Sequence, residues 1–277
     1  MKKMLSLALV LVLMMSLAAC GAKTETPAAT TAPAAAAETT AAATEVEASV
    51  AEVSTIEAGK LIMSTNASFP PYEMIADDGS IEGIDVEVAG AIAQKLGLEL
   101  EVDDMDFDAA LLAVQQNKSD IVMAGVTVTE DRKLVMNFTD SYATGVQVVI
   151  VKEGSDVTLD NLGEKMIGTQ RGTTGYIYTS DDYGDDHVTA YDNGASAVQA
   201  LQNGQVDCVV IDAAPAEAYV EANPGLTILD TEYVTENYAI GVNKDNTSLL
   251  DAVNGALAEL TADGTLDAIV GKYITAE

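Results

Sequence analysis

The stretch of chain from Asp120 to Arg132 holds the residues best suited to binding an anion. A buried strand is expected to end there, Gly125 turns the backbone, and Thr129 with Glu130 begins a short helix that carries Arg132. Strand-end carbonyl groups, a hydroxyl group, free helix amides and a guanidinium group can converge at such a turn. Because arginine presents a planar fork, it matches a carboxylate through two hydrogen bonds in a way that lysine cannot. On spacing alone, a carboxylate site and a surface ion pair of Arg132 with Glu130 are equally compatible with this pattern.

Further motifs lie before and after this stretch. Together with it they occupy residues 66–73 (NASFPPYE), 83–86 (GIDV), 124–132 (AGVTVTEDR) with 138–139 (FT), 170–175 (QRGTTG) and 204–212 (GQVDCVVID). In this order they resemble the successive motifs of the polar amino-acid-binding proteins, family 3 of the bacterial extracellular solute-binding proteins. The resemblance covers the chain from about residue 59 to the C-terminus, and five motifs in register are far more specific than one.

The resemblance implies both a fold and a function. The expected α/β fold has two Rossmann-like lobes joined by a two-strand hinge, which is the periplasmic-binding-protein type II or Venus-flytrap architecture. The expected protein is an extracytoplasmic substrate-binding protein, monomeric, that captures a free amino acid by lobe closure and delivers it to the permease subunits of an ABC importer. Neither a catalytic residue nor a cofactor is expected.

The resemblance also assigns roles at the two charged ends of the ligand. Arg132 would bind the α-carboxylate, helped by Thr127 and by the backbone amide of Thr174 on the opposite lobe. Asp212 would accept the α-ammonium group together with the carbonyl oxygen of Gly125.

Other residues of the motifs would contact the ligand side chain. Phe69 and Phe107 would enclose it between their rings. Asn66, Asp85 and Gln170 would face its tip. The complete expected set of ligand-binding residues is Asn66, Phe69, Asp85, Phe107, Gly125, Thr127, Arg132, Gln170, Thr173, Thr174 and Asp212.

Elementary electrostatics supports the charged part of this assignment independently. A zwitterion that leaves water must have both charges paired, because an unpaired buried charge is costly. One arginine, one aspartate and a few backbone groups are the smallest set that pairs both. Two alternatives stay open. Phe69 and Phe107 could be ordinary core residues, and Asp212 could cap the helix expected at residues 213–221, with or without ligand contact.

The residues at the expected tip favour a polar, uncharged ligand. Relatives selective for basic amino acids tend to carry an acid at the position of Asn66, which is neutral here. Asp85 favours a cation weakly, whereas Gln170 adds a neutral donor and acceptor. We therefore expect glutamine or another neutral amino acid.

Alternating β-like and helix-like runs from residue 60 onward must position these residues. Such alternation is typical of βαβ units and of a largely parallel sheet. The pattern predicts strands at residues 61–65, 98–102, 120–123, 142–152, 165–169, 187–191, 206–211 and 237–242, a loop at 66–80, and helices at 84–96, 107–116, 174–179, 195–202, 213–221, 248–261 and 266–273.

These elements divide naturally into two lobes. We expect residues 55–144 to form the first part of lobe 1, residues 145–237 to form lobe 2, and residues 238–277 to return to lobe 1. The chain would then cross between the lobes twice, near Gly145 and near Tyr238.

The first residues predict export. Lys2 and Lys3 precede an apolar run at residues 4–17 that is too short to span a membrane comfortably. The run leads into Leu-Ala-Ala-Cys-Gly at residues 17–21, which resembles the lipobox of bacterial lipoproteins. Lipidation of Cys20 is therefore expected, and an ordinary cleavage site beside an incidental cysteine is the alternative.

We accordingly expect a lipoprotein signal peptide at residues 1–20. Residues 21–54, rich in Ala, Thr, Pro and Glu, are expected to be a disordered tether, because they offer little apolar surface to bury. The protein would thus be held at the extracytoplasmic face of the bacterial cell membrane by lipid alone.

Charge and cysteine content exclude several classes of partner and site. With 13 basic and 44 acidic residues the net charge is −31, so nucleic acid and anionic lipid surfaces are not expected partners. If Cys20 is lipidated, Cys208 has no partner within the chain, which leaves no disulfide framework. One histidine, His187, and one free thiol exclude a His/Cys metal cluster in practice.

Two other functions on a similar fold stay open. A cyclohexadienyl or arogenate dehydratase-like enzyme would need a general acid, for which Glu73 and Asp85 are the available candidates. Otherwise Tyr72 and Glu73 are expected to be structural parts of the loop that carries Phe69. A sensory ligand-binding module would close in the same way but would need a separate membrane partner.

Overall fold

The computed structural model describes residues 53–230 and 232–274. The expected signal peptide, Cys20 and the expected tether up to residue 52 lie outside the described residues. Among the described helices, none combines the length and the apolar character needed to cross a bilayer.

A nine-stranded sheet runs through both halves of the fold. Its strand order is β5-β1-β6-β12-β7-β10-β8-β9, and β11 pairs with β7. Strand β1 is parallel to β5 and β6, and β8 is parallel to β10 and β9, whereas β7 and β12 run antiparallel to their neighbours. The strands are β1 (Lys60–Thr65), β5 (Glu99–Asp104), β6 (Ile121–Val122), β7 (Met136–Lys152), β8 (Ile167–Gln170), β9 (Val188–Tyr191), β10 (Cys208–Asp212), β11 (Leu226–Ile228) and β12 (Val234–Asn243).

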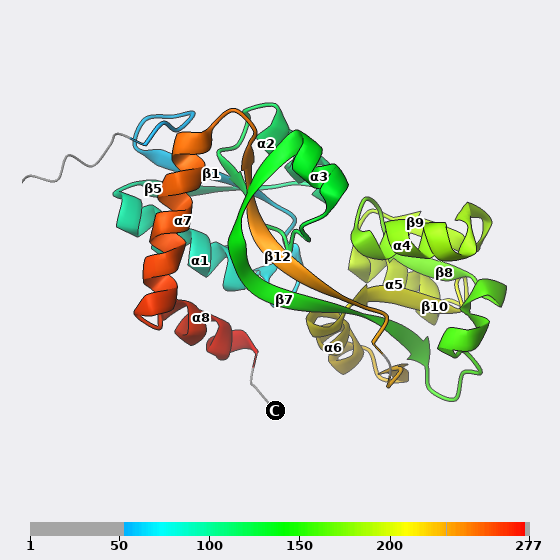
Figure 1. The fold of residues 1–277 in the computed structure, drawn as a ribbon. Coiled ribbons are helices and arrows are strands. Elements are labelled where there is room, and N and C mark those ends of the chain that lie inside the picture. The colour runs from blue at the N-terminus through cyan, green and yellow to red at the C-terminus, as the bar shows by residue number, and fades with distance from the viewer. Residues whose placement is uncertain (1–52, 231, 275–277) are drawn as a thin grey trace, which may run out of the picture. The chain divides into compact units, whose positions relative to one another are not determined.

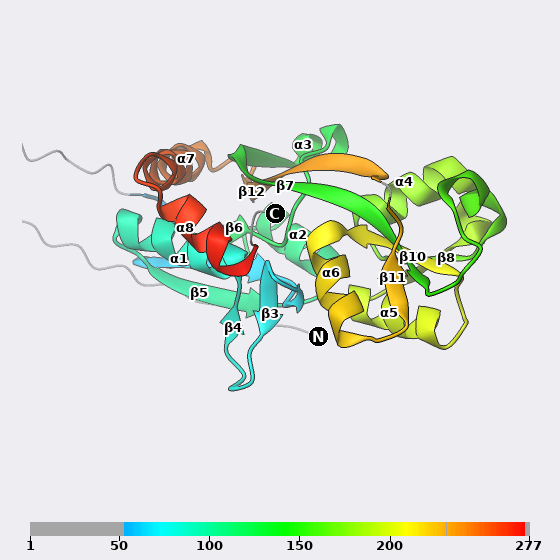
Figure 2. The same cartoon turned by 90° about the horizontal axis from the view of Figure 1, so that it is seen from below.

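The first lobe is the half that contains β5, β1 and β6. Helices α1, α7 and α8 lie side by side against it, as Figures 1 and 2 show, and their apolar faces enclose a core with Leu61 and Met63 of β1. A second cluster joins α2 to β6 and to the start of β7. The helices are α1 (Ile84–Leu96), α2 (Phe107–Gln115), α3 (Glu130–Val135), α7 (Thr247–Ala262) and α8 (Thr265–Tyr273).

The second lobe contains β10, β8 and β9 with helices α4 (Thr174–Tyr183), α5 (Gly194–Gln202) and α6 (Ala213–Ala222). Its sheet is covered on both faces. Val148 and Ile150 of β7 belong to one apolar cluster, and the intervening Val149 belongs to another. Since successive side chains of a strand point to opposite faces, burial on both faces explains why this segment is a continuous β-branched run.

Strands β7 and β12 connect the lobes, and they are hydrogen-bonded to each other along most of their length (Figure 1). Gly145 of β7 lies opposite Glu236 of β12, and Ala143 lies opposite Tyr238. The positions at which the sequence suggests crossings, Gly145 and Tyr238, are thus on these two neighbouring strands.

A small second sheet occupies the segment expected to be a loop. Strands β2 (Ser68–Phe69), β3 (Glu73–Ile75) and β4 (Ile81–Glu82) pair antiparallel, and β4 leads into α1. Runs of two or three residues are too short to show a strand period in sequence, so the loop expectation at residues 66–80 was wrong for this segment. The start of α1 approaches it closely: Gly83 has φ +132°, and a Cβ there would collide with the carbonyl group of Tyr72.

Strand β11 was not expected, and two further elements differ most from their expected bounds. Helix α4 runs on to Tyr183 rather than ending at residue 179, and it ends where Gly184 leaves the helical conformation at φ +88°. Strand β7 begins at Met136, six residues before its expected start, because pairing with β12 continues there.

Candidate functional site

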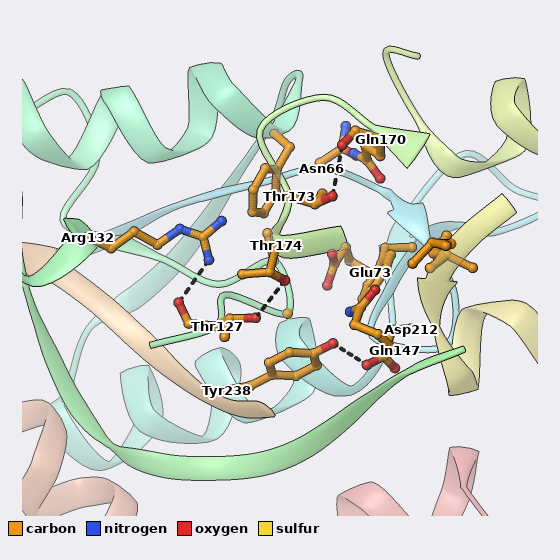
Figure 3. Close-up of a pocket in the computed structure, with 16 residues that line it drawn as sticks. Asn66, Glu73, Thr127, Arg132, Gln147, Gln170, Thr173, Thr174, Asp212 and Tyr238 are labelled. Atoms are coloured by element: carbon orange, nitrogen blue, oxygen red, sulfur yellow. Dashed lines mark hydrogen bonds between the residues drawn. The ribbon is translucent and has the colours of Figure 1, made fainter. Parts of the chain in front are cut away.

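A cavity lies where residues of both lobes meet (Figure 3). Every expected ligand-binding residue except Asp85 lines it. The lining residues are Asn66, Phe69, Glu73, Phe107, Ala124, Gly125, Thr127, Arg132, Gln147, Gln170, Thr173, Thr174, Val210, Ile211, Asp212 and Tyr238.

Arg132 is held inside the protein by α3. The side chain of Thr129 caps this helix by accepting the backbone N–H of Arg132 at 3.2 Å. The guanidinium group donates from Nη1 to the Thr127 carbonyl at 2.8 Å and from Nη2 to the Gly172 carbonyl of the other lobe at 3.1 Å. It also lies 5.4 Å from the centre of the Phe107 ring, within range of a cation–π contact.

The surface alternative for Arg132 is therefore wrong. Arg132 is only 8% exposed, and Glu130 pairs instead with Lys133 at 2.8 Å. Burial lowers the pKa of Arg132, but a guanidinium group remains charged at neutral pH. A buried, charged fork thus faces the cavity.

Threonines from both lobes complete this end of the cavity. The hydroxyl groups of Thr127 and Thr174 lie 3.4 Å apart across the lobes. Thr173 caps α4 by accepting the backbone N–H of Tyr176 at 3.3 Å. Since the first amides of a helix lack partners within the helix, the N-terminus of α4 offers donors to a carboxylate beside Arg132.

Asp212 is the last residue of β10 and the cap of α6 at once. Its Oδ1 accepts the backbone N–H of Ala214 at 3.4 Å, and its Oδ2 accepts the hydroxyl group of Tyr238 at 2.5 Å. Burial raises the pKa of Asp212 to about 7. Capping and cavity lining coexist, so the cap alternative does not exclude ligand contact.

Gly145 of β7 packs directly against this pair. A Cβ at Gly145 would collide with the carboxylate of Asp212 and with the hydroxyl group of Tyr238. The crossing strand therefore requires glycine at this point if both residues are to keep their positions.

Two phenylalanines form the apolar walls. Phe69 stacks on Tyr72, with ring centres 5.7 Å apart, and Tyr72 in turn meets Tyr238 edge to face at 5.4 Å. Phe107 is 6% exposed and also packs into the core of the first lobe. Core packing and cavity lining thus coexist for Phe107 as well.

Two carboxamides from opposite lobes meet beside these walls. Nε2 of Gln170 donates to Oδ1 of Asn66 at 3.0 Å, and Nδ2 of Asn66 donates to the carbonyl oxygen of Met105 at 2.8 Å. These two residues lie together in the cavity wall, as Figure 3 shows.

Asp85 does not face the cavity as expected. It is fully buried in the first turn of α1, and its Oδ2 accepts the backbone N–H of Gly125 at 2.9 Å. The carboxylate therefore binds the turn that contains Gly125 from the side of α1 rather than from the cavity.

Glu73 lines the cavity, although it is not among the expected ligand-binding residues. It is fully buried, and neither oxygen of its carboxyl group has a hydrogen-bond partner among the described residues. Glu73 lies directly opposite Phe69 in the β2–β3 pair, and opposite residues share one face of a sheet. Recognition of this hairpin would have placed Glu73 beside Phe69.

Gln147 and Tyr238, from the two crossing strands, are further lining residues that the sequence interpretation missed. Nε2 of Gln147 donates to Oε2 of Glu236 at 2.9 Å, which links β7 to β12 behind the cavity. Within residues 53–230 and 232–274 no group of three or more His, Cys, Asp or Glu side chains is arranged to hold a metal ion.

Comparison with known proteins gives consistent similarities. The family model "Bacterial extracellular solute-binding proteins, family 3" matches residues 61–276. The probable histidine-binding protein of Neisseria gonorrhoeae is 33% identical over 222 residues, covering 78% of this chain and 83% of that protein. The ABC transporter arginine-binding protein 1 of Escherichia coli K12 is 31% identical over 221 residues, covering 78% and 91%.

A solved structure is similar over the same region. An ancestral arginine-binding protein bound to glutamine superposes with a TM-score of 0.75 at 40% identity, covering 79% of this chain and 99% of that chain. These similarities confirm the expected two-lobed α/β fold and the resemblance read from the motifs. Both relatives are named as amino-acid-binding proteins, the second of them of an ABC transporter, and neither is named as an enzyme, which agrees with the expectation of a non-enzymatic protein.

Proposed function

The chain belongs to family 3 of the bacterial extracellular solute-binding proteins, and on this premise we propose that it binds a free α-amino acid between its lobes and delivers it to an ABC importer permease. One observation carries the proposal. Arg132 and Asp212 are both buried and both line a single cavity, yet neither forms an ion pair within the described residues. A zwitterion supplies the missing partner for each, with its carboxylate at Arg132 and its ammonium group at Asp212.

The α4 amides and the Gly125 carbonyl oxygen add neutral partners at the two ends. Thr174 begins α4, so its amide lies beside the carboxylate position, and Thr127 faces it from the first lobe. Closure of the lobes brings both sets of contacts onto one ligand. The closed state is then favoured by the contacts that the second lobe adds.

For the ligand side chain we propose a long chain that ends in nitrogen donors, with arginine first. Glu73 offers two carboxyl oxygens that have no hydrogen-bond partner in the part of the chain that the structure describes, and they suit a guanidinium group. The relatives that bind histidine and arginine point in the same direction. This choice departs from the expectation of a neutral ligand, which rests on Asn66 and did not include Glu73.

Glutamine is the second candidate. Asn66 and Gln170 present neutral donors and acceptors, which suit a carboxamide. The similar ancestral arginine-binding protein was solved with glutamine bound, which supports this candidate.

The remaining expectations complete the proposal. The lobes are divided at residues 144/145 and 237/238, the protein acts as a monomer, and Cys20 carries a lipid that holds it at the extracytoplasmic face of the membrane. The lipobox resemblance supports the anchor.

A thermal-shift screen of the chain from Gly21 onward against all twenty amino acids and cystine tests the proposal. At a ligand concentration of about 100 Kd, binding adds about 2.7 kcal/mol to the free energy of unfolding, which raises the Tm of a chain of this size by roughly 5–10 °C. Arg132→Ala should abolish the shift, because the ligand carboxylate would then be buried without a charged partner. A flat response across the panel would sink the proposal.

A further inference from the structure

Two buried acidic side chains are neighbours: Glu73 lines the cavity and Asp85 lies behind it. Glu73 of β3 and Asp85 of α1 are each fully buried. The backbone N–H of Asp85 donates to the carbonyl oxygen of Tyr72 at 2.9 Å, which fixes the start of α1 beside the segment that carries Glu73. Glu73 faces the cavity and Asp85 lies behind it.

Two neighbouring carboxyl groups that are both fully buried cannot both be ionised cheaply, so the pair shares one negative charge. Asp85 is the better place for that charge, because its Oδ2 accepts the Gly125 N–H. Glu73 has no such donor among the described residues. Burial and then the charge of Asp85 raise the pKa of Glu73 well above its usual value, whereas burial raises the pKa of Asp85 to about 6. The proton therefore resides on Glu73, the member that faces the cavity.

Among the described residues, those that influence the titration of the pair carry no positive charge. The other titratable groups that are coupled to Glu73 or Asp85 are acids and phenols. They are Asp104 of β5, Tyr72 beside Glu73, Tyr142 of β7 and Tyr219 of α6. Within the described residues neither Glu73 nor Asp85 forms an ion pair with Lys or Arg, and the cations that line the cavity comprise Arg132 alone.

We propose that Glu73 and Asp85 act as one proton-exchanging acceptor that adapts the cavity to the charge of the ligand side chain. The pair keeps its proton when the side chain is neutral. When the side chain is cationic, Glu73 transfers its proton to solvent and the resulting carboxylate pairs with the cation. This inference rests on the proposed function, since it concerns the same cavity and an amino-acid ligand.

The inference predicts that the binding affinities for arginine and for glutamine depend differently on pH. Arginine binding releases one proton from Glu73, so its affinity should rise about tenfold per pH unit as long as Glu73 is protonated in the free protein. Glutamine leaves that proton in place and lacks this dependence. Asp212, whose pKa burial raises to about 7, adds a dependence that is common to both ligands because both carry an α-ammonium group.

Isothermal titration calorimetry in buffers of different ionisation enthalpy measures the proton count directly. At about pH 8 Asp212 is largely ionised, and the difference between arginine and glutamine isolates the side-chain contribution. We expect arginine to release about one proton more than glutamine.

Three variants test which residue releases the extra proton. Glu73→Gln should remove the difference and weaken arginine binding by about 100-fold or more, while glutamine binding changes by less than about tenfold. Asp85→Asn should retain arginine binding with a smaller proton release, because Glu73 then ionises without a charged neighbour. Glu236→Gln is the matched control: Glu236 is also a buried acid, 4% exposed, but does not line the cavity, so the extra proton should persist.

The contrary outcomes distinguish failure of the proton-exchange inference from failure of the proposed function. Equal proton counts for the two ligands, an extra proton that survives Glu73→Gln, or glutamine binding without arginine binding would overturn the proton-exchange inference alone. Failure of every amino acid to bind would overturn the proposed function and this inference with it. Circular dichroism of each variant shows that a lost response is not a lost fold.

Discussion

The phenolic hydroxyl group of Tyr238 donates a 2.5 Å hydrogen bond to Oδ2 of Asp212. The donor comes from β12 and the acceptor from the end of β10, so the bond joins a crossing strand to the second lobe. Burial raises the pKa of Asp212 to about 7. The hydrogen bond from Tyr238 acts in the opposite direction, because it stabilises the ionised carboxylate. Tyr238 therefore keeps Asp212 available as an anion for the ligand.

Tyr238→Phe should weaken amino-acid binding at about pH 7 by roughly 10- to 100-fold, since a hydrogen bond to a charged group contributes about 1.5–3 kcal/mol. The pKa of Asp212 should rise, so the loss should be smaller at about pH 9, where Asp212 ionises again. Calorimetric Kd values at both pH values measure this. Tyr219→Phe is the control: it removes a 2.6 Å cross-lobe bond to the Ser68 carbonyl but leaves the partner of Asp212 in place. An equal loss at both pH values would contradict the assigned role.

Gly145→Ala should destabilise the protein by about 1–3 kcal/mol, because the added methyl group overpacks the Tyr238–Asp212 pair. Urea unfolding followed by circular dichroism gives the change. Gly255→Ala in α7 is the matched control: nothing lies within 4 Å of a Cβ there, and alanine in a helix should stabilise by about 0.5–1 kcal/mol. Wild-type stability of Gly145→Ala would show that the crossing strand tolerates a side chain.

The ligand-free protein should be more stable at about pH 5.5 than at about pH 7.5. Burial raises the pKa of Asp85 to about 6 and that of Asp212 to about 7, so the folded state keeps protons that the unfolded state releases above about pH 4. Stability therefore falls as pH rises through that window, and repulsion within a chain of net charge −31 acts in the same direction.

Melting temperatures measured across this range check the trend. Asp212→Asn should reduce the slope, because it removes one of the buried titrating groups. Asp156→Asn is the control, since Asp156 is exposed and Lys165 lowers its pKa, which places its titration below the window. A Tm that rises from pH 5.5 to 7.5 would contradict the prediction.

Local sequence signals were sufficient to predict α1, the first helix of lobe 1. Helix α1 spans Ile84–Leu96, the range expected from its apolar spacing, and it ends where Gly97 adopts φ +69°. The conformation of the Arg132 segment was equally predictable from sequence, because Thr129 caps α3 and so orients Arg132 within the same six-residue helix. Where a few neighbouring residues determine a conformation, the sequence predicts it.

The roles of Glu73 and Asp85 depend on contacts between distant segments. The orientation of Glu73 follows from the pairing of β2 with β3, strands too short to be visible in sequence. The orientation of Asp85 follows from how α1 is rotated against the Gly125 turn, which lies 40 residues away in the chain. The motifs place both acids near the cavity, but only tertiary packing decides which of them faces the ligand. The signal peptide and the lipidation of Cys20 stay predictions.

The position of β12 in the sheet constrains the order in which the protein can be completed. β12 lies between β6 and β7, yet it is the last strand in the chain. During synthesis, β6 and β7 emerge about one hundred residues earlier and have no strand between them until residues 234–243 follow. The strands of the second lobe, β8 to β11, are all made before that point. Nascent chains should therefore fold the second lobe first, while the first lobe exposes open sheet edges until translation is almost finished.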